Sequence, residues 1–292
     1  MIYNSYQIAE IIGVNVSTVK RWTDSGKLKC SQTVGGHRKF HLNDLKEFLA
    51  TNKKFTASVN TNLLVGKNHT LYEAIATMDF TYMGTYLYQA LRKNNEDKFS
   101  SLINSLILED YSYPSIFDNL IIPLLHRLGD EWINKKLSIS EEHIITEILK
   151  KFLGSINFQY KPTETRYNAF CFTMENDEHS LPLYMAETVL NNINVIKTYN
   201  LGANLPIEDF LNLSKKVDVD IIFISIIYFE DKDLVKSQIK KLCKELSSND
   251  THIFFKGAGI NLIKPKKNIH ILESFEEFHS ILINDYGKIQ LT

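Results

Sequence analysis

The stretch NAFCFTMENDEHSLP, residues 168–182, joins an apolar run to a polar segment that contains Asp177-x-His179. The run NAFCFTM, residues 168–174, has the length and apolar content of a buried β-strand. In an extended loop, residues i and i+2 project to the same side, so the Asp177 carboxylate can accept a hydrogen bond from Nδ1 of His179. Such a bond fixes the tautomer and leaves Nε2 as a metal ligand. The pattern alone also fits a surface histidine bonded to its neighbour.

Four more apolar segments follow this run and alternate with helical stretches. They are NVIKTYN (194–200), VDIIFISIIYF (219–229), HIFFKGAG (252–259) and NIHIL (268–272). Such alternation is typical of a parallel, doubly wound sheet, and we expect residues 165–292 to form a Rossmann-like domain. Ligands of this class bind beyond the carboxyl ends of the strands. Ser225, Gly257 and Gly259 follow or end later strands, so we expect them on the same rim as the Asp-x-His pattern.

The N-terminal residues 1–50 have the layout of a winged helix-turn-helix. SYQIAEIIG (5–13) predicts a short amphipathic helix, and NVSTVKRWTDSGKL (15–28) predicts a second helix capped by Asn15 or Ser17. A Gly-Gly turn with basic residues follows, and then a helix capped by Asn43 or Asp44. The whole chain has a net charge of −1, but residues 1–50 hold seven Lys and Arg against four Asp and Glu, a local charge of +3.

The stretch from Gln7 to Leu49, including GGHRKF, is very similar to the DNA-binding domain of the MerR family. The resemblance implies that the segment binds double-stranded operator DNA. It places Ser17, Thr18, Lys20 and Arg21 at the major groove or its flanking phosphates. It places His37, Arg38 and Lys39 at the phosphate backbone, whereas Val19 and Trp22 are assigned to the core.

Two segments lie between the helix-turn-helix and the sheet. Residues 51–69 are polar and weakly periodic, which predicts a linker that lets the DNA-binding unit move. Residues 70–160 carry apolar positions at spacings of three and four, which predicts a bundle of about four helices. Ser138 and Glu141 are placed to form a capping box in the last of these helices. The predicted fold is therefore a multidomain α and α/β protein.

The C-terminal segment resembles the cobalamin-binding fold of methionine synthase and its relatives, which carry D-x-H-x-x-G, S-x-L and G-G. Here these motifs read Asp177-Glu178-His179-Ser180-Leu181-Pro182, then Ser225-Ile226-Ile227, then Lys256-Gly257. The resemblance implies that His179 is the lower axial cobalt ligand and that Ser225 lies near the nucleotide base. Pro182 and Lys256 stand where the family has glycine. Proline is acceptable in a first helical turn, and Lys256 can either obstruct the nucleotide tail or pair with its phosphate.

The helical segment adds a second resemblance, because Trp132 is followed after nine residues by Glu142-His143. This W-x9-EH pattern resembles the cap of the CarH/LitR light-dependent regulators, which covers the upper face of adenosylcobalamin. Those regulators share the order of helix-turn-helix, helical cap and cobalamin-binding sheet. The resemblance implies a light-sensing repressor of carotenoid or other photoprotection genes that is a homo-oligomer, a tetramer in the dark.

Two alternatives differ from this hypothesis in the sensor or in the class of protein. In the first, the cobalamin site is degenerate, and the regulator is cofactor-free, binds another chromophore such as a bilin, or responds to a partner protein. The second is an enzymatic corrinoid carrier, which the N-terminal helix-turn-helix argues against, and the sequence shows no nucleophile or general-base constellation. Three scattered cysteines and the lack of a long apolar run predict a reduced, cytoplasmic protein without membrane association.

Overall fold

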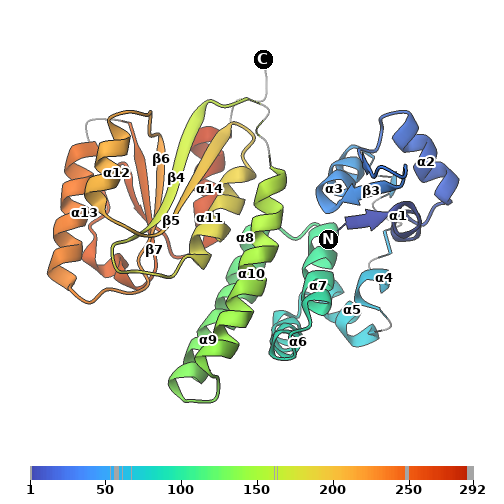
Figure 1. Ribbon diagram of the computed structural model, residues 1–292, viewed down its shortest axis with the longest axis horizontal. Helices are drawn as coiled ribbons and strands as arrows, with labels where there is room; N and C mark the ends of the chain where they lie inside the picture. Colours follow the sequence, from blue (N-terminus) through green and yellow to red (C-terminus); the bar gives the residue numbers. More distant parts are fainter. Residues whose placement is uncertain are drawn as a thin grey trace. The chain divides into compact units, whose positions relative to one another are not determined.

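The computed structural model describes residues 2–52, 54–55, 59–60, 62–66, 68–160, 162, 164–246 and 250–287. The chain divides into two compact units (Figure 1). The first contains Met1–Ser112 and Asn119–Glu141, and the second contains Tyr113–Asp118 and Glu142–Thr292. The helix-turn-helix lies in the first unit and the parallel sheet in the second. The four segments expected from the sequence stay a prediction as domain boundaries.

The N-terminal segment is a winged helix-turn-helix, as predicted. Its elements are β1 (Ile2–Asn4), α1 (Ser5–Ile12), α2 (Val16–Asp24), β2 (Ser31–Gln32), β3 (Arg38–His41) and α3 (Leu42–Thr51). Gly13 has a φ of 73°, a left-handed conformation that glycine adopts without strain, and it ends α1. The three strands form an antiparallel sheet in the order β1-β3-β2. Val19 and Trp22 are buried on the inner side of α2, in the core to which they were assigned.

The caps of the two later helices follow the sequence only in part. Asn15 is the N-cap of α2, and its side chain accepts the backbone N–H of Ser17 at 2.9 Å. The predicted cap of α3 is wrong, because the N-cap is His41 rather than Asn43 or Asp44. Asp44 instead lies in the first turn, and its carboxylate accepts the backbone N–H of His41 at 3.0 Å. An acidic group there also interacts favourably with the positive end of the helix dipole.

The described part of residues 51–69 packs against the helix-turn-helix, and the mobility expected of this linker stays a prediction. The linker residues Lys53, Thr56, Ala57, Ser58, Thr61 and Lys67 lie outside the described residues. The ring of Phe55 lies 5.0 Å from that of Trp22, and the N–H of Asn60 donates to the carbonyl of Ile11 at 2.7 Å. A short helix, α4 (Asn62–Val65), follows. Apolar residues scattered through a polar segment are sufficient to anchor it to the core.

The winged helix-turn-helix also packs on α7 (Glu96–Leu108) within the first unit. Leu108 belongs to the same hydrophobic cluster as the cores of α1, α2 and α3. The side-chain amide of Asn104 donates to the Tyr3 hydroxyl at 3.1 Å, and both residues are only 2% exposed. Burial raises the pKa of Tyr3 to about 12, so the phenol stays neutral. A buried polar contact therefore joins the DNA-binding segment to the helices.

Replacing Asn104 by alanine is expected to lower the free energy of opening of this contact by about 1–3 kcal/mol, because the buried Tyr3 hydroxyl loses its donor. Native-state hydrogen exchange of the helix-turn-helix amides measures this change. The control is Thr85→Ala on α6 (Phe80–Arg92), whose hydroxyl bonds the carbonyl of Thr81 at an exposed position. Equal protection in the two variants would contradict the assignment of Asn104 as the buried link.

Further helices connect the helix-turn-helix to the sheet. Besides α6, they are α5 (His69–Ala76), α8 (Tyr113–Ile116), the π-helical turn η2 (Phe117–Ile121), α9 (Ile122–Ile133) and α10 (Ile139–Gln159). Pro123 lies in the first turn of α9, where its missing N–H leaves no helical bond unmade. Ser138 and Glu141 form the capping box of α10: Ser138 N–H donates to Glu141 Oε2 at 2.9 Å, and Glu141 N–H donates to Ser138 Oγ at 3.2 Å.

The second unit contains a five-stranded parallel sheet, as predicted. The strands are β4 (Tyr167–Met174), β5 (Ile196–Leu205), β6 (Ile221–Ser225), β7 (His252–Lys256) and β8 (Ile269–Ile271), in the order β5-β4-β6-β7-β8. The helices between and after them are α11 (Leu181–Asn191), α12 (Ile207–Ser214), α13 (Lys232–Leu246), the 3-10 turn η3 (Ala258–Leu262) and α14 (Phe275–Tyr286). Strand β4, the first of this sheet along the chain, thus lies between β5 and β6.

Helices cover both faces of the sheet (Figure 1). Alternate residues of β6 point to opposite sides: Ile222 and Ile224 join the cluster that includes α12 and α13, whereas Phe223 contacts Phe275 and Phe278 of α14. Burial on both faces explains why the strand reads as a continuous apolar run. In the described part of the chain, no helix has the length and apolar character needed to cross a membrane.

Candidate functional site

The strand order creates a switch point between β4 and β6, where the connections leave for opposite sides of the sheet. Loops that follow two such neighbouring strands diverge and leave room for a ligand at their carboxyl ends. Asp177 and His179 lie in the loop after β4, and Ile227 and Tyr228 lie in the loop after β6. The Asp-x-His pattern therefore occupies the position where ligands bind in doubly wound folds.

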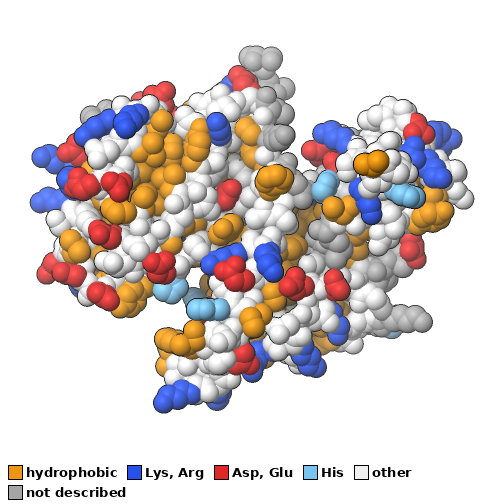
Figure 2. Space-filling model, in the orientation of Figure 1, with side chains coloured by type: hydrophobic (Ala, Val, Ile, Leu, Met, Phe, Trp, Pro, Cys, Tyr) orange, Lys and Arg blue, Asp and Glu red, His pale blue; other side chains and the backbone are white. Residues whose placement is uncertain are grey.

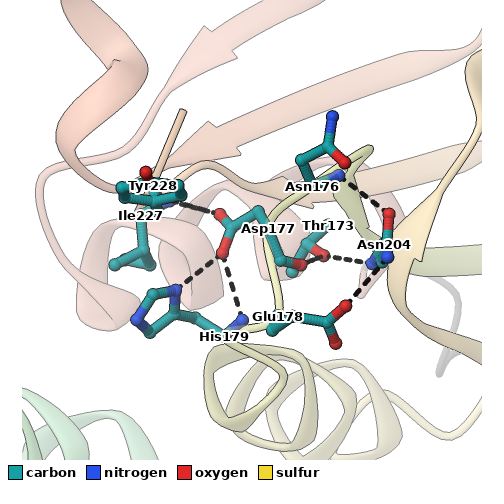
Figure 3. A network of polar contacts seen from close by, with 8 residues as sticks. All are labelled: Thr173, Asn176, Asp177, Glu178, His179, Asn204, Ile227 and Tyr228. Carbon is teal, nitrogen blue, oxygen red and sulfur yellow. Dashed lines mark hydrogen bonds and ion pairs between the residues drawn. The ribbon is translucent and has the colours of Figure 1, made fainter. Parts of the chain in front are cut away.

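Asp177 is fully buried, and its carboxylate joins the two loops (Figure 3). Oδ2 accepts the backbone N–H of Ile227 at 2.7 Å and of Tyr228 at 3.2 Å. Oδ1 accepts the backbone N–H of His179 at 3.0 Å and lies 2.7 Å from its Nδ1. Burial would raise the pKa of Asp177, but these hydrogen bonds outweigh it and lower that pKa. The carboxylate therefore stays ionised and acts as an anchor.

His179 is oriented by this anchor while its ring stays accessible. Its side chain is 55% exposed, and Nδ1 faces Asp177. The hydrogen bond to Asp177 raises the pKa of His179, with partial burial opposing it. With Nδ1 as the donor to the carboxylate, the lone pair of the neutral ring lies on Nε2. The chain thus presents one oriented imidazole nitrogen at the rim of the sheet.

Asn204, which the sequence analysis did not select, holds the same loop from β5. Its side chain accepts the N–H of Asn176 and donates to Glu178 Oε1, both at 2.8 Å (Figure 3). Its backbone N–H donates to the Thr173 hydroxyl at 2.8 Å, and that hydroxyl donates to the carbonyl of Asp177. The φ of Asn204 is 58°, a conformation that asparagine tolerates better than most residues. An asparagine between a glycine-containing strand end and a helix start was the available signal.

Ser225, Gly257 and Gly259 lie around the end of β6. The Ser225 hydroxyl is buried, and among the described residues it has no hydrogen-bond partner. A Cβ on Gly257, whose φ is 116°, would lie 2.5 Å from the carbonyl oxygen of Ile226. A Cβ on Gly259 would collide with the Ile226 side chain. The two glycines therefore allow close packing on Ile226, directly after β6, and Ser225 is a buried hydroxyl without a partner in the described part of the chain.

The two departures from the cobalamin motif do not disturb this arrangement. Pro182 lies in the first turn of α11, a position that needs no backbone donor. The ammonium of Lys256 donates to the carbonyl of Glu273 at 2.6 Å and lies 5.2 Å from the centre of the Phe275 ring. The Lys256 side chain is thus engaged with the residues at the start of α14, and its two roles toward a nucleotide tail stay predictions.

The three residues of the W-x9-EH pattern are divided between the two units. Trp132 lies in the last turn of α9 in the first unit and is half exposed. Glu142 and His143 lie in the first turns of α10 in the second unit, with His143 Nε2 3.6 Å from Glu142 Oε2. Glu142 Oε1 accepts the hydroxyl of Thr146 at 2.6 Å. Glu142 is also among the carboxylates whose charge raises the pKa of His179.

Most of the predicted DNA-contacting side chains are exposed on the helix-turn-helix. Figure 2 shows Lys, Arg and His side chains gathered on this part of the molecule. Ser17, Lys20, Arg21 and His37 are exposed, whereas Thr18 and Lys39 are partly buried. The Ser17 hydroxyl donates to the Asn15 side chain at 2.8 Å. These positions offer positive charge and hydroxyl groups of the kind that bind DNA phosphates.

Arg38 is placed differently from the other predicted DNA contacts. Its guanidinium forms an ion pair with Asp24 at 2.5 Å, and its side chain is only 19% exposed. Asp24 ends α2, and Arg38 begins the strand β3 of the wing. The pair therefore links the wing to the second helix, and Arg38 orients these elements in the free chain.

The comparisons with known proteins match two parts of the chain. A helix-turn-helix domain family matches residues 2–53, and a B12 binding domain family matches residues 85–156. This chain combines a helix-turn-helix domain with a B12-binding domain. The B12 binding match begins within α6 and ends within α10, and it includes Trp132, Glu142 and His143.

One relative and one solved structure are similar to much of this chain. The HTH-type transcriptional repressor CarH of Myxococcus xanthus is 23% identical over 231 residues, which are 72% of this chain and 74% of that protein. This chain is therefore its distant homologue. The monomethylamine corrinoid protein of Methanosarcina barkeri matches with a TM-score of 0.53 and 14% identity, over 68% of this chain and 95% of that one. That likeness shows a shared fold over about two thirds of this chain.

Proposed function

We propose that this protein is a cytoplasmic transcriptional repressor that senses light through adenosylcobalamin. The observation that carries the proposal is the oriented imidazole of His179 at the switch point. It is joined by the buried hydroxyl of Ser225 at the end of β6, which has no partner among the described residues. The described residues contain no group of three His, Cys, Asp or Glu side chains that could hold a metal ion. A single imidazole suits a metal that a macrocycle already holds.

The residues at the rim fit such a cofactor. His179 would hold the cobalt through Nε2, with Asp177 fixing the ring, and Ser225 would donate to the nucleotide base. Trp132, Glu142 and His143 would contact the upper face, which the W-x9-EH resemblance supports. Adenosylcobalamin supplies a cobalt–carbon bond that light breaks. The chain itself supplies no nucleophile or general base in this proposal, and its role is regulatory rather than enzymatic.

The DNA-binding part of the proposal rests on exposed residues of α2 and the wing. Lys20, Arg21 and Lys39 would neutralise operator phosphates, and Ser17 and Thr18 would lie at the major groove. A single small helix-turn-helix binds DNA weakly, so we propose a homo-oligomer, a tetramer in the dark, that holds several units on one operator. Binding through several linked units raises the apparent affinity by about 10²–10⁴. Illumination would dissociate the oligomer and release repression of photoprotection genes such as those for carotenoids.

Size-exclusion chromatography with in-line absorbance tests the proposal, on protein with adenosylcobalamin in the dark and after illumination. We expect a corrin spectrum that co-elutes with a larger dark species, and a smaller species in light. Bound corrin without a change in size would overturn light-dependent assembly. Absence of bound corrin would overturn the cofactor and favour a degenerate site that is cofactor-free, binds a chromophore such as a bilin, or is read by a partner protein.

Replacing Ser225 by alanine is expected to weaken adenosylcobalamin binding without lowering the stability of the fold. The variant loses a buried hydroxyl that has no partner in the described chain, so its unfolding free energy should be unchanged or about 1 kcal/mol higher. Its affinity for adenosylcobalamin should fall by about tenfold through one lost hydrogen bond. Urea unfolding and absorbance titration measure the two quantities. The control Ser214→Ala removes a hydroxyl that bonds the Leu211 carbonyl at 3.0 Å, and it should leave affinity unchanged.

A further inference from the structure

One face of α6 contacts two glutamates of other helices, Glu131 and Glu141. Each of them directly precedes a residue of the proposed cofactor cap. Tyr88 and Arg92 are four residues apart in α6 and therefore lie on the same side of that helix. Tyr88 contacts Glu131, the residue before Trp132, and Arg92 contacts Glu141, the residue before Glu142. These four residues all belong to the first unit. One face of α6 thus contacts both the end of α9 and the start of α10.

In the contact with α9, both oxygens of the Glu131 carboxylate accept a hydrogen bond. The Tyr88 hydroxyl donates to Glu131 Oε2 at 2.6 Å, and Arg127 Nε donates to Oε1 at 3.2 Å. The Arg127 guanidinium also lies 3.5 Å from the centre of the Tyr88 ring, close enough for a cation–π interaction. The hydrogen bond from Tyr88 lowers the pKa of Glu131, so that side chain stays ionised. Tyr88 of α6 therefore contacts the last two turns of α9 twice, through the Glu131 carboxylate and through the Arg127 guanidinium.

The contact with α10 uses a carboxylate that already caps the helix. Arg92 Nη1 donates to Glu141 Oε1 at 3.0 Å, while Oε2 accepts the backbone N–H of Ser138 at 2.9 Å. The start of α10 is therefore both closed by its capping box and tied to α6. Surface ion pairs of this kind contribute little to global stability. Their effect is geometric, because each ties down a residue adjacent to the cap.

We propose that Tyr88 and Arg92 are positioning residues that set the orientation of Trp132 and the start of α10 for cofactor binding. This inference rests on the proposed function, because Trp132 and the start of α10 belong to the proposed cofactor cap. The mobility of Trp132 can nevertheless be measured without the cofactor. Neither residue touches the cofactor in this proposal. Loss of the two anchors leaves the fold intact but lets the end of α9 and the start of α10 move independently.

The test uses single-tryptophan protein, because the chain has only two tryptophans, Trp22 and Trp132. In the full chain with Trp22→Phe, Trp132 emission reports its own surroundings without any cofactor. We expect Tyr88→Phe combined with Arg92→Gln to lower the fluorescence anisotropy of Trp132. We expect the same pair to weaken adenosylcobalamin binding by about tenfold, with Arg92→Lys in place of Arg92→Gln restoring part of the loss.

The matched control is Lys150→Gln, which breaks the 3.0 Å ion pair with Glu147 on α10 and touches neither anchor. It should change neither anisotropy nor affinity. Unchanged Trp132 anisotropy in the double variant overturns the positioning role, and so does an equal loss in the control. If the parent protein binds no adenosylcobalamin, the proposed function fails, but the anisotropy of the cofactor-free chain still decides the role of Tyr88 and Arg92. Tyr88→Phe alone removes one hydroxyl and provides a milder variant with a correctly folded chain.

Discussion

The His179→Ala variant is expected to bind adenosylcobalamin at least about 100-fold more weakly than the parent protein and to unfold at nearly the same denaturant concentration. Partners that merely orient a metal ligand are worth about 10–100-fold in affinity, so the ligand itself should be worth no less. The side chain is more than half exposed, and its removal leaves no cavity. The variant loses the hydrogen bond from Nδ1 to Asp177, and this loss should lower the free energy of unfolding by about 1 kcal/mol.

Absorbance titration in the dark measures this affinity, and urea unfolding measures the stability. The control is His37→Ala, which removes an exposed histidine of the wing and should lower DNA binding without changing cofactor affinity. A second variant, His179→Gly, should recover part of its cobalamin binding when imidazole is added. If His179→Ala retains the parent affinity, His179 is not the lower ligand, and the orientation imposed by Asp177 serves another purpose.

The sequence predicted the rim because the relevant residues are close to strand ends. Apolar runs of five to eight residues mark where β4 and β6 end, and the carboxyl ends of parallel strands share one edge. Asp177 and Ser225 could therefore be assigned to that edge without knowledge of the strand order. The contact of Asp177 with Ile227 and Tyr228 could not be predicted, because it requires β4 and β6 to be neighbours although β5 lies between them in the chain.

Contacts between distant side chains account for most of what the sequence did not predict. Tyr3 and Asn104 are 101 residues apart, and neither stands out in a local pattern. Phe55 was counted in a polar segment, yet its ring packs on Trp22. The resemblance to the MerR family placed Arg38 at the DNA backbone. Its ion pair with Asp24 was not predicted, because it depends on where the wing meets α2. Periodicity reports which face of an element is buried but not which side chain it meets.

The Asp177→Ala variant is expected to lose both stability and cofactor binding, in contrast to His179→Ala. Removing this buried carboxylate leaves the backbone N–H groups of His179, Ile227 and Tyr228 without their acceptor. Each unsatisfied buried donor costs about 1–3 kcal/mol, and these donors are only partly buried, so we expect a total loss of about 3 kcal/mol or more. The loops after β4 and β6 would then separate, and His179 would lose its orientation.

Asp231→Ala is the matched control for this variant, because the Asp231 carboxylate also accepts two backbone N–H groups, of Asp233 at 2.9 Å and Leu234 at 3.0 Å, but at an exposed helix start. It should cost about 1 kcal/mol, as helix caps do, and leave the cofactor affinity unchanged. Urea unfolding of the two variants gives the comparison. Equal losses would mean that Asp177 acts only as a local loop cap. A larger loss for Asp177→Ala, together with near-parent stability for His179→Ala, would divide the pair into a residue that holds the fold and a residue that holds the ligand.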